Sequence, residues 1–377
     1  FGGIDVVSHG LFAALSVLVV ACPCVIGLAT PVALAAGLNK AARNHILIRD
    51  TSALEQMRNV DVVVFDKTGT LTEGHPTVIG WLWAQGQEEH YKDVLLAAES
   101  TSDHPLAEAI VTALEGEEQV IPAHLDGFEN ITGKGVRVVY QGAEYWVGSH
   151  KLLKDYQANL SDILADMLTQ YESDGNSIVY FGRENDLLAV IAIKDQLRVT
   201  SMEAIRELRI QDIEICMLTG DGERTASSVA GSLGIMRFVA DAMPDDKEDF
   251  IHKLQLQGKT VAMVGDGVND AQALSCADVS IAMGKGTDTL MDTAMITLRT
   301  SDLLLLPKVF RLSRQTVSLM YRNLFWAFIY NTVGIFVAAG VLYPVYDILL
   351  SPALAGAAMA LSCVSVALSS LRLSSRF

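Results

Sequence analysis

Three uncharged and strongly apolar stretches dominate the pattern of hydrophobic and polar positions, one near the start of the chain and two near its end. No charged residue lies between Asp5 and Lys40, and similar stretches run from Asn323 to Tyr346 and from Ile348 to Leu371. A helix of about 20 residues crosses a hydrocarbon core of roughly 30 Å, so each stretch predicts a membrane-spanning helix. Basic residues flank these helices on the side of the central region. The positive-inside rule therefore places residues 40–322 and the C-terminus in the cytoplasm.

Between these stretches the pattern changes to short apolar runs that alternate with helical periodicity. The runs predict parallel strands at Val62–Phe65, Leu188–Ile193, Ile213–Leu218, Thr260–Val264 and Val279–Ile281. Helical patterns between them predict connecting helices near residues 201–210, 223–233, 245–257 and 270–276. Strands and helices that alternate in this way are typical of a doubly wound, Rossmann-type α/β fold.

Residues from about 75 to 187 interrupt this rhythm and predict an inserted α+β domain. They carry helical stretches at 91–115 and 149–173 around strand-like pieces at Arg137–Tyr140 and Tyr145–Val147. The chain is therefore predicted to be multidomain. The predicted parts are a transmembrane helix (1–40), an α/β domain in two pieces (41–74 and 188–306), the insertion (75–187), and two transmembrane helices with a cytoplasmic C-terminus (307–377).

The composition supports a membrane protein with an acidic, water-exposed part. Half of the 377 residues are hydrophobic, yet 44 acidic against 28 basic residues give a formal net charge of −16. An acidic balance argues against nucleic-acid binding, which requires a basic face, so no nucleic-acid partner is expected. Five cysteines are an odd number without the spacing of a disulfide framework, and we expect them to be reduced thiols.

A carboxylate ends the first predicted strand of the α/β domain. Asp66 follows Val62–Phe65 and is followed by Lys67-Thr68-Gly69-Thr70. Open α/β sheets bind ligands at the carboxyl ends of their strands, so Asp66 is expected at such an edge. From the residues alone this aspartate could be a metal ligand, a helix cap, or a nucleophile that takes up a phosphoryl group.

Three further segments end a predicted strand or open a predicted helix with groups that a phosphoryl transfer needs. Thr219 and Asp221 follow one strand, and a hydroxyl with backbone amides can bind phosphate oxygens. Lys247 opens a helix and can neutralise charge in the transition state. Asp266 and Asp270 follow another strand and can hold Mg²⁺ through hard oxygen ligands. Each of these segments alone would be a weak signal.

The sequence Cys22-Pro23-Cys24 lies in the middle of the first apolar stretch. Proline there removes a backbone hydrogen bond and frees carbonyl groups. Two thiols beside that break can face one soft ion, and thiolates select Cu(I), Zn²⁺ and similar metals. Buried and inert cysteines are the alternative interpretation.

Together these motifs resemble the heavy-metal-transporting branch of the P-type ATPases, which is related to the haloacid-dehalogenase-like phosphotransferases. The resemblance rests on Asp-Lys-Thr-Gly-Thr, Thr-Gly-Asp, Gly-Asp-Gly-Val-Asn-Asp and Cys-Pro-Cys. It implies that Asp66 is phosphorylated by ATP, with Lys67, Thr68, Thr219, Asp221 and Lys247 around the transferred group. It also implies a Mg²⁺ ion between Asp66, the Thr68 carbonyl and Asp266, supported by Asn269 and Asp270. The implied ATP pocket contains Glu99, His104, Gly133, Gly135 and Gly148.

The last two predicted helices resemble the copper(I) branch of this family. Tyr330, Asn331 and Met359 match its positions, and Cys363 stands where that branch has serine. The resemblance implies a copper site formed by these four residues with Cys22 and Cys24. It further implies the C-terminal half of a multi-pass pump in the plasma (inner) membrane, surrounded by lipid, that receives Cu(I) from a copper chaperone or thiol carrier.

Other interpretations and some departures from the family pattern remain at this point. A pump for silver, zinc or cadmium, a soluble haloacid-dehalogenase-like phosphatase, and a non-enzymatic copper-binding membrane protein are the alternatives. Gln196 and Arg198 replace the proline and lysine that usually follow Asp195, and Gln272 replaces another proline. No Thr-Gly-Glu loop, which the family uses to dephosphorylate the aspartate, occurs in the sequence.

Overall fold

The computed structural model describes residues 4–84, 88–102, 104–117, 120–158, 162–266, 270–284, 294–346 and 349–375. These residues divide into two compact units. The helical unit consists of Phe1–Asn59 with Lys308–Phe377, and the α/β unit consists of Val60–Pro307. The asparagine at position 269, an implied Mg²⁺ ligand, lies outside the described residues.

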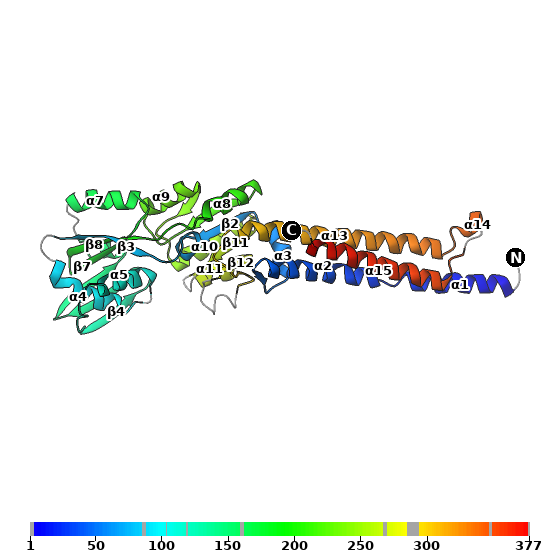
Figure 1. Ribbon diagram of the computed structural model, residues 1–377, viewed down its shortest axis with the longest axis horizontal. Helices are drawn as coiled ribbons and strands as arrows, with labels where there is room; N and C mark the ends of the chain where they lie inside the picture. Colours follow the sequence, from blue (N-terminus) through cyan, green and yellow to red (C-terminus); the bar gives the residue numbers. More distant parts are fainter. Residues whose placement is uncertain are drawn as a thin grey trace. The chain divides into compact units, whose positions relative to one another are not determined.

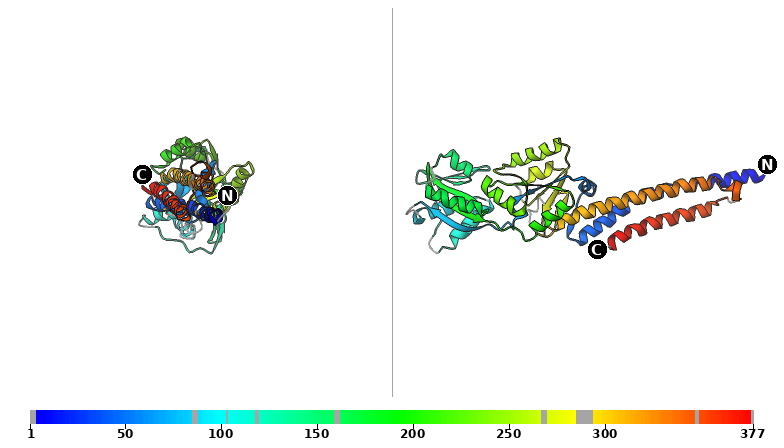
Figure 2. Two further views of the ribbon diagram at one scale, coloured as in Figure 1. Left: turned by 90° about the vertical axis from the view of Figure 1, so that its right-hand side faces the viewer. Right: turned by 90° about the horizontal axis from the view of Figure 1, so that it is seen from above.

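Long helices form the helical unit. They are α1 (Ile4–Val20), α2 (Cys24–Arg43), α13 (Leu305–Ala338) and α15 (Pro352–Ser375), accompanied by the short elements β1 (Ile46–Ile48), α3 (Ser52–Gln56) and α14 (Tyr343–Tyr346). Helices α2, α13 and α15 run side by side (Figures 1 and 2). Small residues permit this approach: a Cβ on Gly37 of α2 would lie 2.6 Å from the hydroxyl oxygen of Thr316 on α13.

The first apolar stretch was predicted as one helix, and the structure corrects this prediction. Helix α1 ends at Val20 and α2 begins at Cys24, with Pro23 as its N-cap. Proline has no backbone N–H to donate, and its ring clashes with the preceding turn, so a break at this position follows from the sequence. The break places both cysteines beside a non-helical turn.

Within the described residues, two helical segments are long and apolar enough to cross a membrane, Ser8–Arg43 and Pro352–Arg372. The third predicted span, Asn323–Tyr346, lies mostly in α13 and is not among them. The mean hydropathy of a span is taken over 18 residues of a helix. Because α13 ends at Ala338, any such segment in its apolar half includes the polar residues Asn323 and Asn331, which lower the mean. The prediction of a third span therefore receives no support from hydropathy.

A parallel sheet lies at the centre of the α/β unit, as the sequence predicted. Its strands follow the order β13-β12-β11-β2-β9-β10, with bounds Ile296–Leu298, Val279–Met283, Val261–Gly265, Val62–Asp66, Glu214–Leu218 and Arg237–Val239. The helices that accompany these strands are α8 (Ser201–Ile210), α9 (Glu223–Leu233), α10 (Pro244–Leu256) and α11 (Ala271–Cys276). Every residue of β2 is buried, which explains its unbroken apolar sequence.

A second, antiparallel sheet has the order β3-β8-β7-β6-β5-β4. In chain order the strands are β3 (Thr77–Trp83), β4 (Gly127–Ile131), β5 (Gly135–Tyr140), β6 (Ala143–Gly148), β7 (Ser177–Arg183) and β8 (Asp186–Lys194). Its helices are α4 (Glu88–Glu99), α5 (Pro105–Glu115), α6 (His150–Asp155) and α7 (Asp162–Ser173). Figure 1 shows α4 and α5 together beside this sheet.

The prediction that Leu188–Ile193 is a parallel strand of the first sheet is wrong. These residues lie in β8, which pairs antiparallel with both β3 and β7. One hydrophobic cluster contains Leu188, Ile191 and Ile193, and another contains Val190. Successive side chains of a strand point to opposite faces, and these two clusters cover both faces of β8. The strand therefore has the continuous apolar sequence that is typical of a buried parallel strand.

Candidate functional site

The carboxyl end of β2 brings together the polar residues that the sequence singled out. Strand β2 lies between β9 and β11 in parallel register, so the residues that follow all three strands meet at one edge. Asp66 ends β2, Thr219 follows β9, and Asp266 follows β11. The ligand edge predicted for an open α/β sheet is therefore formed by this region.

A lysine from α10 holds two of these carboxylates. The Nζ atom of Lys247 lies 2.6 Å from Oδ1 of Asp66 and 2.7 Å from Oδ1 of Asp270. All three side chains are buried. Burial alone would lower the pKa of Lys247, but the charges of Asp66 and Asp270 raise it above its ordinary value. The ammonium group therefore stays charged and directs one oxygen of Asp66.

Lys67, the residue after Asp66, enters a different network. Its ammonium group forms an ion pair with Asp221 and donates to the hydroxyl of Ser177 at 3.1 Å. The hydroxyl of Thr219 donates to Asp221 at 2.9 Å. Burial would raise the pKa of Asp221, but Lys67 and the hydrogen bonds lower it overall. Through Ser177 on β7, this network links the loop after Asp66 to the second sheet.

Asp66, Asp266 and Asp270 form a carboxylate cluster. One oxygen atom of each lies within 4.8 Å of the others. Burial and the nearby charge of Asp66 raise the pKa values of both Asp266 and Asp270 to about 7. Lys247 balances only part of this negative charge. Three carboxylates this close are a donor set that fits a hard divalent cation.

The loop after Asp66 requires glycine at its third position. Gly69 has φ +69°, and a Cβ there would lie 1.4 Å from Oδ2 of Asp266. The backbone of the loop thus passes directly against the Asp266 carboxylate. Thr68 lies in the same turn in an extended conformation.

Two residues outside the expected site, Asp195 and Arg198, fix this loop, and of these only Arg198 departs from the family pattern. Asp195 accepts hydrogen bonds from the Thr72 hydroxyl at 2.5 Å and from the Gly74 amide at 3.1 Å. The buried guanidinium group of Arg198 donates to the carbonyl oxygens of Thr70 at 3.0 Å and Gly69 at 2.5 Å. The guanidinium group of Arg198 can form both bonds because its donors are arranged in a fork, which the ammonium group of a lysine at this position would not offer.

For the phosphorylation of Asp66 that the family resemblance implies, we expect Arg198→Lys to slow the reaction about tenfold and to leave ATP affinity nearly unchanged. The shorter fork-less side chain loses one of the two bonds to the loop, and small displacements of reacting groups cost large factors in rate. Rapid-quench labelling with γ-labelled ATP measures the rate. Arg206→Lys on α8 is the matched control, because Arg206 is exposed and pairs only with exposed Glu203 in the described contacts. Equal rates for Arg198→Lys and the parent would contradict this role.

Two of the predicted ATP-pocket residues lie at the junction of α4 and α5. Glu99 ends α4 and is buried, and burial raises its pKa to about 7. His104 is the N-cap of α5, and its Nδ1 accepts a hydrogen bond from the Leu106 amide at 3.2 Å. A cleft of about 310 Å³ beside them is lined by Glu99, Ser100, Ser102, Glu108 and Val111.

The three predicted pocket glycines have backbone roles in the second sheet. Gly135 and Gly148 are opposite each other in the β5–β6 pair. A Cβ on Gly135 would lie 2.1 Å from the Val147 carbonyl oxygen, and one on Gly148 would lie 2.2 Å from the Lys134 carbonyl oxygen. Gly133 has φ +70° in the turn before β5. Close strand approach explains Gly135 and Gly148, and the positive φ explains Gly133. The described lining of the 310 Å³ cleft includes none of the three.

The helical unit places the two cysteines of the helix break together. Cys22 and Cys24 form a disulfide with Cα atoms 5.5 Å apart, whereas Cys216, Cys276 and Cys363 are free. The prediction that all five cysteines are reduced is thus wrong for this pair, because the turn at Pro23 directs both sulfur atoms to the same point. A disulfide offers no thiolate, so metal binding requires the reduced form of this pair.

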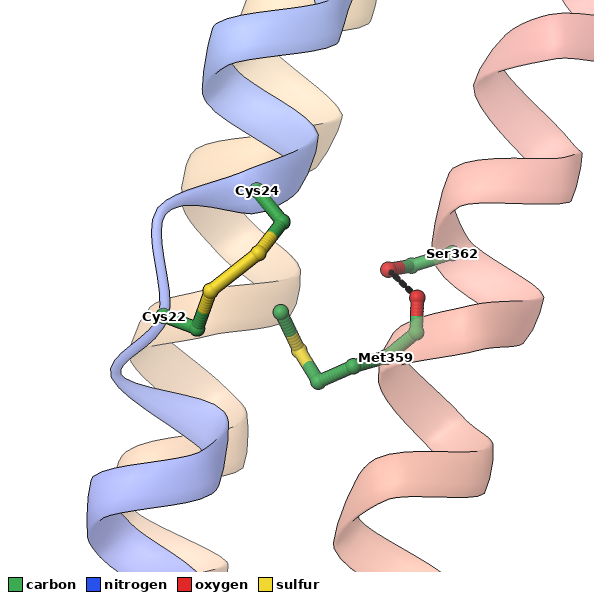
Figure 3. The surroundings of a disulfide bond; sticks show 4 residues. All are labelled: Cys22, Cys24, Met359 and Ser362. Atoms are coloured by element: carbon green, nitrogen blue, oxygen red, sulfur yellow. Dashed lines mark hydrogen bonds between the residues drawn. A yellow bond between two sulfur atoms is a disulfide. The ribbon is translucent and has the colours of Figure 1, made fainter.

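The side chain of Met359 points from α15 toward the two cysteines (Figure 3). Its backbone carbonyl accepts a hydrogen bond from the Ser362 hydroxyl at 2.7 Å. Met359 and Cys363 both pack against the cluster of Val25, Ala29, Ala327 and Val366. The structure therefore places a third sulfur beside the pair and a fourth one turn along the same helix.

The two predicted ligands on α13 differ in their surroundings. Asn331 is buried, and within the described residues its Oδ1 has no hydrogen-bond partner. Tyr330 is 39% exposed and stacks against Trp326 with ring centroids 5.8 Å apart. Asn331 thus presents an unsatisfied polar atom inside the helical unit, while Tyr330 lies on a more open face.

Comparisons with known proteins agree with this geometry. The haloacid dehalogenase-like hydrolase family profile matches residues 60–278. A copper-exporting P-type ATPase of Legionella pneumophila is 44% identical over 97% of this chain and 50% of its own length. A silver exporting P-type ATPase of Salmonella typhimurium is 44% identical over 98% of this chain and 44% of its own length. The chain therefore spans about half the length of these curated relatives.

Solved structures give the same picture. A zinc-transporting PIB-type ATPase in the E2.Pi state matches 94% of this chain and 56% of its own, with a TM-score of 0.65 and 34% identity. The catalytic domain of a CPx-ATPase, CopB-B, studied for its changes on nucleotide binding, matches 72% of this chain and 97% of its own. Its TM-score is 0.60 and its identity 28%.

Proposed function

This chain belongs to the haloacid dehalogenase-like hydrolase family, in the branch of the heavy-metal P-type ATPases, and on this premise we propose that it serves ATP-driven export of copper(I). The observation that carries the proposal is the position of Asp66. It ends the central strand, one of its oxygens is held by Lys247, and two further carboxylates stand beside it. This arrangement suits a carboxylate that attacks phosphorus and must be stabilised as charge moves.

Each residue of the edge has a proposed part in the transfer. Lys247 holds Oδ1 of Asp66, so Oδ2 is the oxygen that forms the bond to the γ-phosphorus while the bond to the leaving ADP breaks. The Thr219 hydroxyl and nearby amides bind the phosphoryl oxygens. Lys67 keeps Asp221 paired and the loop in place. Glu99 is proposed to contact the nucleotide in the cleft that it lines, and His104 to do so from the N-cap of α5.

Mg²⁺ is the cation that this carboxylate cluster fits best. Asp66, Asp266 and Asp270 would hold it, with the Thr68 carbonyl and the asparagine at position 269 as further proposed ligands. When bound, the ion neutralises charge on the phosphoryl oxygens. Burial and the nearby charge of Asp66 raise the pKa values of Asp266 and Asp270, and a bound divalent cation would favour their charged forms.

The cargo is proposed to be Cu(I). Reduced Cys22 and Cys24 with Met359 offer three soft sulfur donors in one place, and Cu(I) prefers few, soft ligands. The apolar parts of α13 and α15 contain no aspartate or lysine between Asn323 and Tyr346 or between Ile348 and Leu371, which a zinc or cadmium site would use. Ag(I) has the same soft character and remains the second candidate because a silver exporter is equally similar.

The partners follow from this assignment. Cu(I) is proposed to arrive bound to a copper chaperone or thiol carrier, because the free ion is strongly held by cellular thiols. The chain is proposed to lie in the plasma (inner) membrane with the α/β unit in the cytoplasm, consistent with its apolar helices. The soluble-phosphatase alternative is disfavoured by Thr68, which stands where such enzymes carry a second aspartate, and by those helices.

Transport into sealed vesicles that contain the full-length pump tests the proposal. ATP should drive uptake of Cu(I), and Ag(I) should compete with it, whereas Zn(II) should not. ATP-driven uptake of Zn(II) without uptake of Cu(I) would overturn the copper assignment. Cys22 and Cys24 must be reduced beforehand, since the disulfide removes both thiolates.

Cys363→Ser should raise the Cu(I) concentration needed for half-maximal phosphorylation about tenfold. This is the lower end of the loss in metal affinity that is typical when a group supporting a metal site is removed. Cys363 lies one turn from Met359 and packs against the same cluster, so its thiol adds a soft donor near the pathway. Cys363→Met keeps a sulfur atom and is the matched control. Unchanged Cu(I) dependence in Cys363→Ser would show that this thiol only packs.

A further inference from the structure

A second group of potential metal ligands lies on α10 and α11, outside the carboxylate cluster. Glu248 and His252 are four residues apart on α10, and Cys276 ends α11. One ligand atom of each residue lies within 4.8 Å of the others. Positions four apart share one face of a helix, so the glutamate and the histidine point the same way. The proposed phosphotransfer uses none of these three residues.

Gln255 organises this group. Its Nε2 atom donates to the Cys276 carbonyl at 2.9 Å, so its Oε1 is the atom that faces Nδ1 of His252 at 3.2 Å. An amide oxygen only accepts, so Nδ1 is the nitrogen that donates in this contact. The other ring nitrogen, Nε2, lies 3.5 Å from Oε1 of Glu248. A histidine whose other nitrogen is held in this way is the usual form of a metal ligand.

From this geometry we propose that Glu248, His252 and Cys276 bind one Zn²⁺-class ion on the surface of the α/β unit. Zinc in proteins is held by thiolate, imidazole and carboxylate in tetrahedral geometry, and this group offers one of each. Ligands around such an ion stand roughly 3.3 to 3.8 Å apart, which the 4.8 Å limit allows after small side-chain rotations. A water molecule would complete the four ligands.

Access and chemistry separate this site from the carboxylate cluster. The His252 side chain is 51% exposed and that of Glu248 is 37% exposed, so an ion can enter from solvent. The carboxylate cluster offers only hard oxygen donors, whereas this group includes nitrogen and sulfur. Mg²⁺ prefers the former and a borderline metal the latter.

A bound ion would link α10 to α11, the helices that position Lys247 and Asp270. Lys247, which holds Asp66, directly precedes Glu248 on α10. Asp270 is the N-cap of α11, and Cys276 is the last residue of that helix. The site therefore joins the elements that carry Lys247 and Asp270 without touching either side chain, and the ion should stabilise the folded unit.

Metal titration of the full chain tests this site. The parent for the experiment carries Cys22→Ser, Cys24→Ser and Cys363→Ser, which removes the cysteine sulfurs of the helical unit, and excess Mg²⁺ is added for the carboxylate cluster. Zn²⁺ affinity is measured by competition with a chromophoric chelator. Co²⁺ replaces zinc as a spectroscopic probe, because a thiolate ligand gives it an intense charge-transfer band.

The parent should bind one Zn²⁺ and show the Co²⁺–thiolate band. Cys276→Ser should abolish the band and weaken Zn²⁺ binding at least tenfold, and His252→Ala should weaken it similarly. His124→Ala is the control, because His124 is exposed and belongs to neither group. Zn²⁺ should also raise the midpoint of thermal unfolding in the parent but not in Cys276→Ser.

Absence of the Co²⁺–thiolate band in the parent, or equal Zn²⁺ affinity in the parent and Cys276→Ser, would overturn the proposal. Glu248 and His252 would then be an ordinary exposed pair. These measurements need neither ATP nor transport, so their outcome is independent of the proposed pumping function.

Discussion

Replacing Asp66 with asparagine is expected to abolish the acyl-phosphate while leaving ATP binding nearly intact. An amide cannot attack phosphorus as a carboxylate does, yet asparagine has almost the same shape and can still accept a hydrogen bond from Lys247. The predicted nucleotide residues are Glu99 at the end of α4 and His104 at the N-cap of α5, so the substitution leaves them unchanged. Incorporation of label from γ-labelled ATP, with its release by hydroxylamine, measures the intermediate.

Asp61→Asn is the matched control for this experiment. Asp61 immediately precedes β2, at the opposite end of the strand from Asp66, and its exposed carboxylate accepts a hydrogen bond from the Thr260 amide at 2.9 Å. This variant should be phosphorylated like the parent. Hydroxylamine-labile label on Asp66→Asn would show that another residue is the nucleophile.

Lys247→Met should slow phosphorylation at least a hundredfold and also destabilise the protein in the absence of metal. The variant removes the only ammonium group described as contacting Asp66 and Asp270. Removing one partner of a buried charge pair typically costs about 3–5 kcal/mol, because the remaining charges stay buried without compensation. In catalysis, the loss also removes positive charge where the transition state needs it.

The loss of stability should depend on pH in a defined direction. The pKa of Asp270 is about 7 even with Lys247 present, well above the value of 3.8 for an unperturbed aspartate, and removal of the ammonium group raises it further. A carboxyl whose pKa is raised by folding binds a proton more readily in the folded state, so folding becomes more favourable as pH falls through the raised pKa. The destabilisation by Lys247→Met should therefore be larger at pH 8 than at pH 5.5.

Thermal or denaturant unfolding at the two pH values measures this effect. Lys253→Met is the control, because Lys253 lies on the same helix, α10, but is exposed. A Lys247→Met protein as stable as the control at pH 8 would contradict the view that this lysine balances the carboxylate cluster.

The meeting of three polar residues at one edge of the sheet could be predicted from sequence because each of them ends or follows a strand. The apolar runs of β2, β9 and β11 mark buried parallel strands, and Asp66, Thr219 and Asp266 come directly after them. Once the strands are parallel, those residues must meet at one edge. Local pattern and general topology are sufficient for this part of the site.

Other features depend on contacts that local pattern does not contain. Strand β8 has the same apolar run as a parallel strand, and only its pairing with β3 and β7 assigns it to the second sheet. Only the structure shows that Arg198 fixes the loop after Asp66, because its hydrogen-bond partners are backbone carbonyls about 130 positions earlier in the chain. The disulfide depends on how the turn at Pro23 directs two side chains that a continuous helix would separate.

The central claim is that Asp66 is phosphorylated by ATP when a soft metal occupies the sulfur site of the helices. The most direct measurement is a titration of hydroxylamine-labile phosphoenzyme in the full-length, reduced pump with Cu(I) and, separately, with Zn(II). Cu(I) should raise the phosphoenzyme level in a saturable manner that Cys22→Ser abolishes and Zn(II) does not reproduce. A phosphoenzyme level that is the same with and without Cu(I), or that responds only to Zn(II), would contradict the account.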